Sequence, residues 1–347
     1  MPESEDSSLL SHLQMNLTCS QPFSIVDDES VAQFLDTAGR ISHWFYSYWI
    51  YLIPPYSLVS NFFVIIILLQ SEMRSSGINN MMTAIAFCDI IFSLCAFANF
   101  FVTDTHDTFL GAILPAVYIY LGVAFHALSI HIGVGIGFCR VMVLRESRNS
   151  NKWQTSKYAL TVSTVLFFYV FIVSLLFLRH YTWPEYLLTD GVYKIYWDTE
   201  DGCSFFKFTL FINAIVFKLI PCILMTIFSI QILNSMRKSR RSRVITLGFR
   251  ADNSHIDRSS NLIFGIAVLF LITEFPAVIY NLVSSVFTDD YIKILFGIGT
   301  FIDFLTQVNN ASTFLMYCFL SSKFRKLCWR VIPIKKPIST TENFKIA

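Results

Sequence analysis

Four ionisable side chains stand in the middle of long apolar stretches of this sequence. They are Asp89, Lys218, Glu274 and Asp303. Ionisable groups are costly in a hydrocarbon environment, so they tend to face a partner, a cavity or the interior of a helix bundle. Each of the four is therefore a candidate for the recognition of a ligand or an ion.

Lys218 and Glu274 carry opposite charges and are expected at a similar depth in neighbouring antiparallel helices. A buried cation and anion at one level are cheapest when they pair, and a charged ligand could open such a pair. A permanent structural salt bridge, or a Lys218 side chain that reaches a membrane boundary, fits the same residues. Asp303 and His126 are the other candidates for a ligand-binding cavity, although a lone histidine is more often a hydrogen-bonded core residue.

Asp89, Ser129 and Asn310 bring three oxygen-bearing side chains to a similar depth. Such oxygens could hold a hard monovalent cation or a network of water molecules. The alternative is a hydrogen-bond network between helices in which Asp89 is protonated. These residues alone favour neither interpretation.

Seven apolar stretches, each of about 20 residues or more, must position these side chains. We expect helices over residues 46–69, 78–102, 111–142, 157–179, 207–235, 261–287 and 293–318. Their apolar residues run continuously, whereas the strands of a membrane barrel alternate apolar and polar residues. Pro221 and Pro276 are expected to kink the fifth and sixth helices. Gly133, Gly135 and Gly137 are expected to allow close packing along the third.

The amino-acid composition also indicates a protein that lies in a lipid bilayer. Of 347 residues, 54% are hydrophobic and only 14% are charged, whereas soluble domains carry roughly 25% charged residues. The sequence therefore predicts an all-α membrane protein, a seven-transmembrane helix bundle. We expect a tail over 1–43, the bundle over 44–320 and a second tail segment over 321–347.

The charges segregate by side of the predicted membrane. With the N-terminus outside, the inner segments hold 20 of the 26 basic residues and the outer segments hold 16 of the 24 acidic residues. Basic residues are retained on the cytoplasmic side, so we expect an extracellular N-terminus and a cytoplasmic C-terminus in the plasma membrane. The net charge of +2 gives no sign of a nucleic-acid partner. Asn16-Leu-Thr18 is a glycosylation sequon in the outer tail.

Five short motifs lie within the first, second, third, sixth and seventh of the expected helices. They are Ser60-Asn61, Ile85-Ala86-Phe87-Cys88-Asp89, Phe138-Cys139-Arg140-Val141, Thr273-Glu274-Phe275-Pro276 and Asn309-Asn310-Ala311 through Phe314. With these motifs the sequence resembles rhodopsin-like G-protein-coupled receptors. The closest likeness is to the nematode serpentine chemoreceptors of class w, which are related to FMRFamide-type peptide receptors.

The resemblance implies roles for several residues. Asp89 stands where the family has its sodium-site carboxylate, with Ser129 and Asn310 as its usual companions, so the ion-linked interpretation gains weight. Arg140 stands where the family has the arginine that couples to the G protein. Ser321 to Trp329 resembles the short amphipathic eighth helix.

Departures from the family pattern are equally informative. Cys139 replaces the acid that normally restrains the arginine, so a locked inactive state of that kind is in doubt. Glu274 replaces the tryptophan that usually acts as a switch, and members of class w share this replacement. Ala311 and Phe314 replace the proline and tyrosine of the motif in the seventh helix.

The cysteine pattern also departs from the family. The cysteine expected at the top of the third helix is absent, so Cys203 in the second outer loop lacks its standard partner. Cys19 is the other clearly extracellular cysteine, and a Cys19 to Cys203 disulfide is our hypothesis. Cys328 is a candidate for palmitoylation, and an unmodified thiol is the alternative.

These features favour a receptor for an extracellular ligand, a short neuropeptide or an environmental chemical, that signals through a heterotrimeric G protein. Membrane lipid is the other expected partner. The basic segment Arg237 to Arg243 suits a G-protein interface, and ordinary positive-inside charge explains it almost as well. The rival is a membrane channel or secondary transporter, which commonly shows repeated halves that this sequence lacks. No nucleophile–base set, phosphate loop or metal cluster indicates an enzyme, and we expect no cofactor and no metal beyond sodium.

Overall fold

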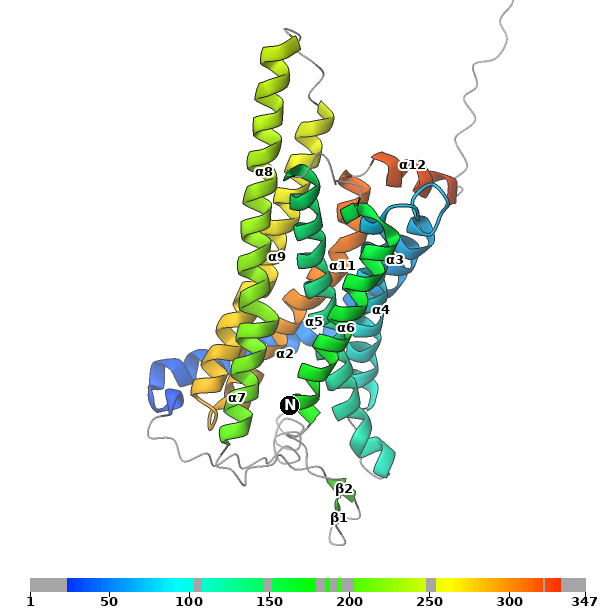
Figure 1. The fold of residues 1–347 in the computed structure, drawn as a ribbon. Coiled ribbons are helices and arrows are strands. Elements are labelled where there is room, and N and C mark those ends of the chain that lie inside the picture. Colours follow the sequence, from blue (N-terminus) through cyan, green and yellow to red (C-terminus); the bar gives the residue numbers. More distant parts are fainter. Residues whose placement is uncertain are drawn as a thin grey trace, which may run out of the picture.

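The computed structural model describes residues 24–102, 108–145, 152–178, 185–187, 192–194, 203–247, 254–320 and 322–331. Long helices run side by side in this part of the chain and form one bundle (Figure 1). The uninterrupted helices of the bundle are α3 (Ile53–Leu68), α4 (Gly77–Val102), α5 (Phe109–Arg145), α6 (Ser156–Leu178) and α9 (Ser254–Val286). The prediction of an all-α membrane protein is confirmed.

Two further helices of the bundle contain π-helical segments. One is built from α7 (Ser204–Ile212), the π-helix η3 (Asn213–Leu219) and α8 (Ile220–Leu247). The other is built from α10 (Tyr291–Ile294), the π-helix η4 (Leu295–Gly299) and α11 (Thr300–Leu320). Smaller elements are η1 (Ile25–Asp27), η2 (Lys152–Gln154) and the antiparallel strands β1 (Glu185–Leu187) and β2 (Val192–Lys194).

Most of the described bundle helices are long and apolar enough to cross a membrane. Five qualify individually: α4, α5, α6, the helix that runs from α7 into α8, and α9. The helices α2 (Glu29–Trp49) and α3 qualify only as a pair that bends by 46°. Helix α11 carries Gln307, Asn309 and Asn310 in its interior, which lowers its apolar content, and it packs against α3 and α9. Together with α3 and α11, the five form the seven-helix bundle.

The first span differs from the expected helix over 46–69. Helix α2 ends at Trp49, and α3 begins at Ile53. Pro54 and Pro55 lie in the first turn of α3, where they have no N–H to continue the hydrogen-bond ladder of α2. The region 1–43, expected as a tail, therefore contains most of a helix within its described part.

Asp28 begins helix α2. Its carboxylate accepts hydrogen bonds from the hydroxyl and the N–H of Ser30 and from the N–H of Val31. The Ser30 hydroxyl bond, followed by the two backbone bonds, holds the pKa of Asp28 below its ordinary range. The carboxylate thereby satisfies donors that the first turn of a helix leaves unpaired.

The expected kink in the fifth helix takes the form of a π-helix. Its seven residues end two positions before Pro221, and they include Lys218. A π-helical segment rotates the side chains that follow it relative to a regular helix, and such segments are frequent at functional sites. Pro276 lies inside α9, two residues after Glu274.

The α12 helix (Ser322–Val331) covers the end of α11 and forms the expected amphipathic eighth helix. Its Phe324 is buried and stacks on Tyr317 with ring centroids 4.9 Å apart. Arg325 donates to the carbonyl oxygens of Cys318 and Phe319 at 3.0 and 2.8 Å. These bonds satisfy carbonyls that the end of α11 leaves without partners.

Glycines differ in how closely their surroundings approach. A Cβ on Gly77 would meet the backbone carbonyl oxygens of Thr155 and Gln154, and one on Gly137 would lie 3.2 Å from the ring of Phe228. A Cβ on Gly133 would meet no other atom within 4 Å. The expectation of close packing at Gly133 is therefore wrong, because this residue lines a cavity.

Candidate functional site

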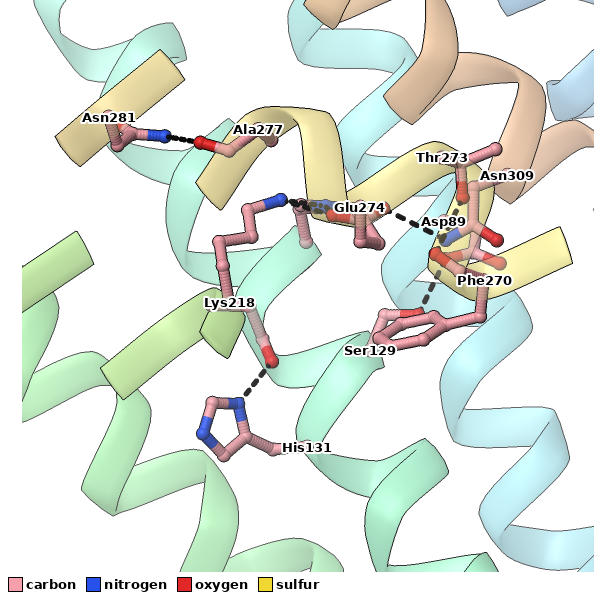
Figure 2. A network of polar contacts seen from close by, with 12 residues as sticks. Asp89, Ser129, His131, Lys218, Phe270, Thr273, Glu274, Ala277, Asn281 and Asn309 are labelled. Carbon is pink, nitrogen blue, oxygen red and sulfur yellow. Dashed lines mark hydrogen bonds and ion pairs between the residues drawn. The ribbon is translucent and has the colours of Figure 1, made fainter. Parts of the chain in front are cut away.

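A buried cluster of charges joins three of the predicted ligand-binding residues. Lys218 Nζ lies 2.5 Å from Glu274 Oε2 and 2.7 Å from His126 Nε2. His126 Nε2 lies 3.3 Å from the same Glu274 oxygen. Figure 2 shows Lys218 and Glu274 pointing toward one another. We call these three residues, together with Asn309, the charge cluster.

Asn309 is the fourth member. Its side-chain amide donates to Glu274 Oε1 at 3.0 Å, so both oxygens of this carboxylate have partners. Glu274 is 0% exposed. The four side chains come from α5, η3, α9 and α11. The charge cluster therefore ties four parts of the bundle together at one point.

The geometry assigns the protons within the charge cluster. The Lys218 ammonium has donors only, so His126 Nε2 accepts its hydrogen bond. The His126 ring then carries its proton on Nδ1 and is neutral, and it packs on the ring of Phe92 with centroids 4.9 Å apart. The cluster thus contains one cation and one anion, and its net charge is zero.

Asp303 lies apart from the charge cluster. Its side chain is exposed, and no hydrogen bond or ion pair joins it to another described residue. It does lie close enough to Lys218 for the two charges to interact. Asp303 is therefore an accessible carboxylate on the same helix as Asn309, two turns earlier in the sequence.

Asp89 is at the centre of a second polar group. Its Oδ1 accepts from the Ser129 hydroxyl at 2.8 Å and its Oδ2 accepts from the Thr313 hydroxyl at 3.4 Å. The side chain of Asn310, the third predicted member, lines the same cavity. A carboxylate with two hydroxyl groups beside a cavity is an oxygen donor set that fits a hard monovalent cation.

A chain of buried polar contacts connects the first, second and seventh helices. The Asn61 amide donates to the Asn310 carbonyl oxygen at 3.2 Å and to the Ser57 hydroxyl at 3.2 Å. The Ser93 hydroxyl donates to the Ser57 hydroxyl at 2.9 Å and lies 3.4 Å from Gln307 Oε1. Asn61 belongs to a motif in the sequence, whereas polar type alone did not single out Ser57, Ser93 or Gln307 among the many serines and amides.

A cavity of about 750 Å³ is lined by Asp89 and extends to Ser322 and Lys323 at the start of α12. Arg140 lines it, and no ion pair joins Arg140 to an acidic side chain in the described parts of the chain. The neighbouring Cys139 is buried. Methionine and other apolar side chains make up much of the lining, among them Met73, Met82, Met225, Met236, Met316, Leu144 and Ile232.

Tyr317 is a residue of this cavity that sequence reasoning missed. It lines the cavity with Arg140, and the two side chains lie close enough to interact electrostatically. The family resemblance placed Phe314 at the position of the tyrosine in the motif of the seventh helix. Tyr317 follows Phe314 by three residues, so it lies on nearly the same helix face, and this spacing was the signal that could have identified it.

The cysteine and glycosylation predictions fall partly outside the described residues. Cys203 is disulfide-bonded, but Cys19 lies outside the described part of the chain, as does Asn16. The six other described cysteines are free. Cys328 is half-buried and packs with Cys318 against the hydrophobic cluster beneath α12.

The profile of the family described as serpentine type 7TM GPCR chemoreceptor Srw matches residues 48–335. This range holds the charge cluster, the Asp89 group and the Arg140 cavity. The chain belongs to this family. As a member of the Srw family it is a multi-pass membrane protein from a class of receptors, and the rival of a channel or transporter is not favoured.

One relative of this Srw protein is the G-protein coupled receptor dmsr-1 of Caenorhabditis elegans. The two sequences are 22% identical over 342 aligned positions, which cover 80% of this chain and 66% of the relative. The chain thus spans just under two thirds of the length of that relative.

Proposed function

We propose that this chain is a plasma-membrane receptor with its N-terminus outside and its C-terminus in the cytoplasm. It binds an extracellular ligand between its helices and activates a heterotrimeric G protein. The observation that carries this proposal is the cavity at the α12 end, where Arg140 is free of any acidic partner among the described residues. An unpaired arginine in a cavity of this size is available to a protein segment that enters from the cytoplasm.

The lining of the cavity suits such a segment. Methionine side chains adapt to different partners because they are unbranched and polarisable, and they are common on surfaces that bind amphipathic helices. Arg140 and Tyr317 supply polar groups to the lining of the cavity. Arg237 and Lys238, late in α8, add positive charge. An amphipathic segment of a G protein would bury its apolar side on the methionines and present acceptor groups to the arginine.

The ligand is proposed to act on the other half of the bundle. The outer segments carry 16 acidic and 5 basic residues, counted from the sequence, so their field attracts a cationic ligand. Asp303 is an accessible carboxylate within the bundle on that side, and the charge cluster lies deeper. We favour a short peptide with a basic group at Asp303, and a small environmental chemical is the alternative.

The charge cluster is proposed as the link between the ligand and the rest of the bundle. Its four members come from four segments, so a relative movement of these segments must stretch or break contacts of 2.5 to 3.3 Å. A ligand that binds better to one arrangement of the bundle shifts the population toward it. Sodium at Asp89, Ser129 and Asn310 would favour the arrangement that holds this oxygen set together.

Three covalent features complete the proposal. Asn16 carries a glycan, Cys19 pairs with Cys203, and Cys328 carries a palmitoyl group that anchors α12 to the inner leaflet. The first two belong on the extracellular side and the third on the cytoplasmic side, as the proposed orientation requires.

The proposal is tested by a G-protein activation screen. The full chain is expressed with heterotrimers of each Gα class and exposed to libraries of short peptides and small molecules, and nucleotide exchange is measured. We expect at least one ligand to raise exchange through one class of G protein. A ligand-evoked whole-cell current without nucleotide exchange would instead support the channel alternative.

A further inference from the structure

Helix α2 presents three different faces along its 21 residues. The first packs on the bundle through the buried residues Leu35, Ser42 and Trp49. The Ser42 hydroxyl makes its shortest bond, at 3.1 Å, to the Gly39 carbonyl oxygen of its own helix, and it also lies 3.4 Å from the carbonyl oxygens of Phe296 and Gly297 in η4. A Cβ on Gly297 would lie 2.9 Å from Leu35 Cδ2, so α2 and η4 approach closely. Helix α2 is thereby fixed to the first part of the seventh helix.

The second face is apolar, and it is exposed. Phe34, Ile41, Trp44 and Tyr48 have exposed fractions of 63%, 64%, 64% and 57%. Their spacing of seven, three and four residues places them on one side of the helix. The rings of Trp44 and Tyr48 contact each other, with centroids 5.1 Å apart. We call these four residues the apolar stripe.

The third face is polar and exposed. Asp36 and Arg40 form an ion pair at 3.1 Å, one turn apart, and His43 and Ser47 follow on the same side. A helix with one apolar and one polar exposed face is suited to lie in the plane of a membrane interface. Figure 1 shows α2 running across the bundle, in the half that lies away from α12.

The apolar stripe continues into a surface that already faces lipid. Tyr51 and Leu52 are exposed in the bend between α2 and α3. On α3, Val59 and Phe62 are exposed as well. The bent pair of α2 and α3 is long and apolar enough to cross a membrane, and α3 is the part that packs along α4 and α11, so its exposed apolar side chains contact lipid. The lipid-facing surface of α3 therefore continues through the 46° bend at residues 50–52 into the apolar stripe, and no exposed polar residue interrupts it.

We propose that α2 is an interfacial helix whose apolar stripe inserts among the phospholipids of the outer leaflet. Trp44 and Tyr48 suit the boundary between head groups and acyl chains, where aromatic rings with a polar edge are enriched. The polar face then contacts water. The acidic residues Asp27, Asp28 and Glu29 at the start of α2 oppose an anionic lipid surface, so zwitterionic phospholipid is the partner.

The consequence concerns the seventh helix. The α2 helix is held by lipid on one face and by η4 on another, so it fixes the outer end of the seventh helix relative to the bilayer. Asp303 lies just after η4 in this same helix. The inference rests on the membrane fold and, for the choice of the outer leaflet, on the proposed orientation; it is independent of the ligand and of the G protein.

The test compares neighbouring positions on the two exposed faces. Single cysteines replace Ile41 and Trp44 on the apolar stripe, or His43 and Ser47 on the polar face. All are made in a background that carries Cys318→Ser and Cys328→Ser, since the four other described free cysteines are buried. Each cysteine is labelled with an environment-sensitive fluorophore, and the protein is placed in phosphatidylcholine nanodiscs.

We expect labels on the apolar stripe to emit at shorter wavelengths and to be quenched several-fold more strongly by spin-labelled phosphatidylcholine than by iodide. Labels at His43→Cys and Ser47→Cys should show the reverse. Equal quenching of both faces by iodide would overturn the proposal. Protection of the apolar stripe from lipid only in discs that hold two receptors would also overturn it, because a second copy would then be the partner.

Two further measurements keep the test decisive. Replacing half of the phosphatidylcholine by an anionic lipid should leave the quenching pattern unchanged, and a pattern that requires anionic lipid would overturn the choice of partner. A photoactivatable phosphatidylcholine is also crosslinked to the unsubstituted protein, so the outcome does not depend on whether the variants fold. Adducts on the apolar stripe would support the proposal, and adducts on the polar face, or none on α2, would overturn it.

Discussion

Removing one member of the Lys218–Glu274 pair should destabilise the protein far more than removing both charges. Lys218→Met leaves the fully buried Glu274 carboxylate with Asn309 at 3.0 Å and the neutral ring of His126. Leaving a buried charge uncompensated costs about 3–5 kcal/mol. Because Asn309 still donates to the carboxylate, the cost of Lys218→Met should be near the lower end of this range.

Glu274→Gln is expected to cost more. It leaves the Lys218 ammonium buried, with the neutral ring of His126 as its remaining hydrogen-bond partner, at 2.7 Å from Nε2. The cost should therefore be near the upper end of the same range, about 4–5 kcal/mol. The double variant Lys218→Met/Glu274→Gln has no buried charge at this point. Its glutamine can still accept a hydrogen bond from Asn309, so it should unfold within about 2 kcal/mol of the parent protein.

The assay is reversible unfolding of the purified chain in mixed micelles with increasing denaturing detergent, followed by circular dichroism. Glu29→Gln is the matched control, because this exposed carboxylate has no hydrogen bond or ion pair to another described residue; it should change stability by less than about 0.5 kcal/mol. The reasoning is refuted if the double variant loses the sum of the two single costs, about 7 kcal/mol, since independent sites add and coupled sites do not.

Three other predictions concern packing, capping and covalent structure. Gly77→Ala should lower the midpoint of thermal unfolding because its Cβ would meet backbone carbonyl oxygens, whereas Gly133→Ala should keep or raise it, since alanine favours a helix by about 1 kcal/mol over glycine; equal effects would contradict the packing. The pKa of Asp28 is lowered in the folded state, so its contribution to α2 is present above the unfolded value and is lost as the pH falls through the folded value, below about pH 4. The protection factors of the first-turn amides of α2, which correct the exchange rate for its intrinsic pH dependence, should therefore fall at acidic pH in the parent but not in Asp28→Asn; protection that is independent of pH in both would contradict this cap. Thiol labelling of intact, unreduced protein should leave Cys19 and Cys203 unmodified, and labelling of both would exclude their disulfide.

The sequence was sufficient for the bundle because a membrane imposes a simple rule on helix length and apolar content. It was insufficient where the chain bends, because the rule on length and apolar content does not give the direction of a helix. Continuous apolar character over 46–69 predicted one span, but Pro54 and Pro55 separate α2 from α3, so the chain bends there. The apolar stripe of α2 was not predicted, because Phe34 and Ile41 fell in the expected tail and Tyr48 in the expected first span.

The charge cluster was predicted in part. Opposite charges at one depth indicated the Lys218–Glu274 pair, and the structure places them 2.5 Å apart. The π-helix before Pro221 shifts the register of the fifth helix, so spacing alone could not show which face carries Lys218. Asp303 was grouped with this pair because of its charge, yet its side chain is exposed and separate.

The central claim is that Arg140 couples the bundle to a G protein, and Arg140→Ala tests it most directly. Surface expression and nucleotide exchange are measured together, with the ligand and the G protein that the activation screen identifies. Arg145→Ala is the matched control, because Arg145 lies on the same helix but is exposed and does not line the cavity. We predict that Arg140→Ala reaches the surface in the parental amount and loses exchange, while Arg145→Ala retains both. Undiminished exchange by Arg140→Ala at equal surface expression would contradict the account.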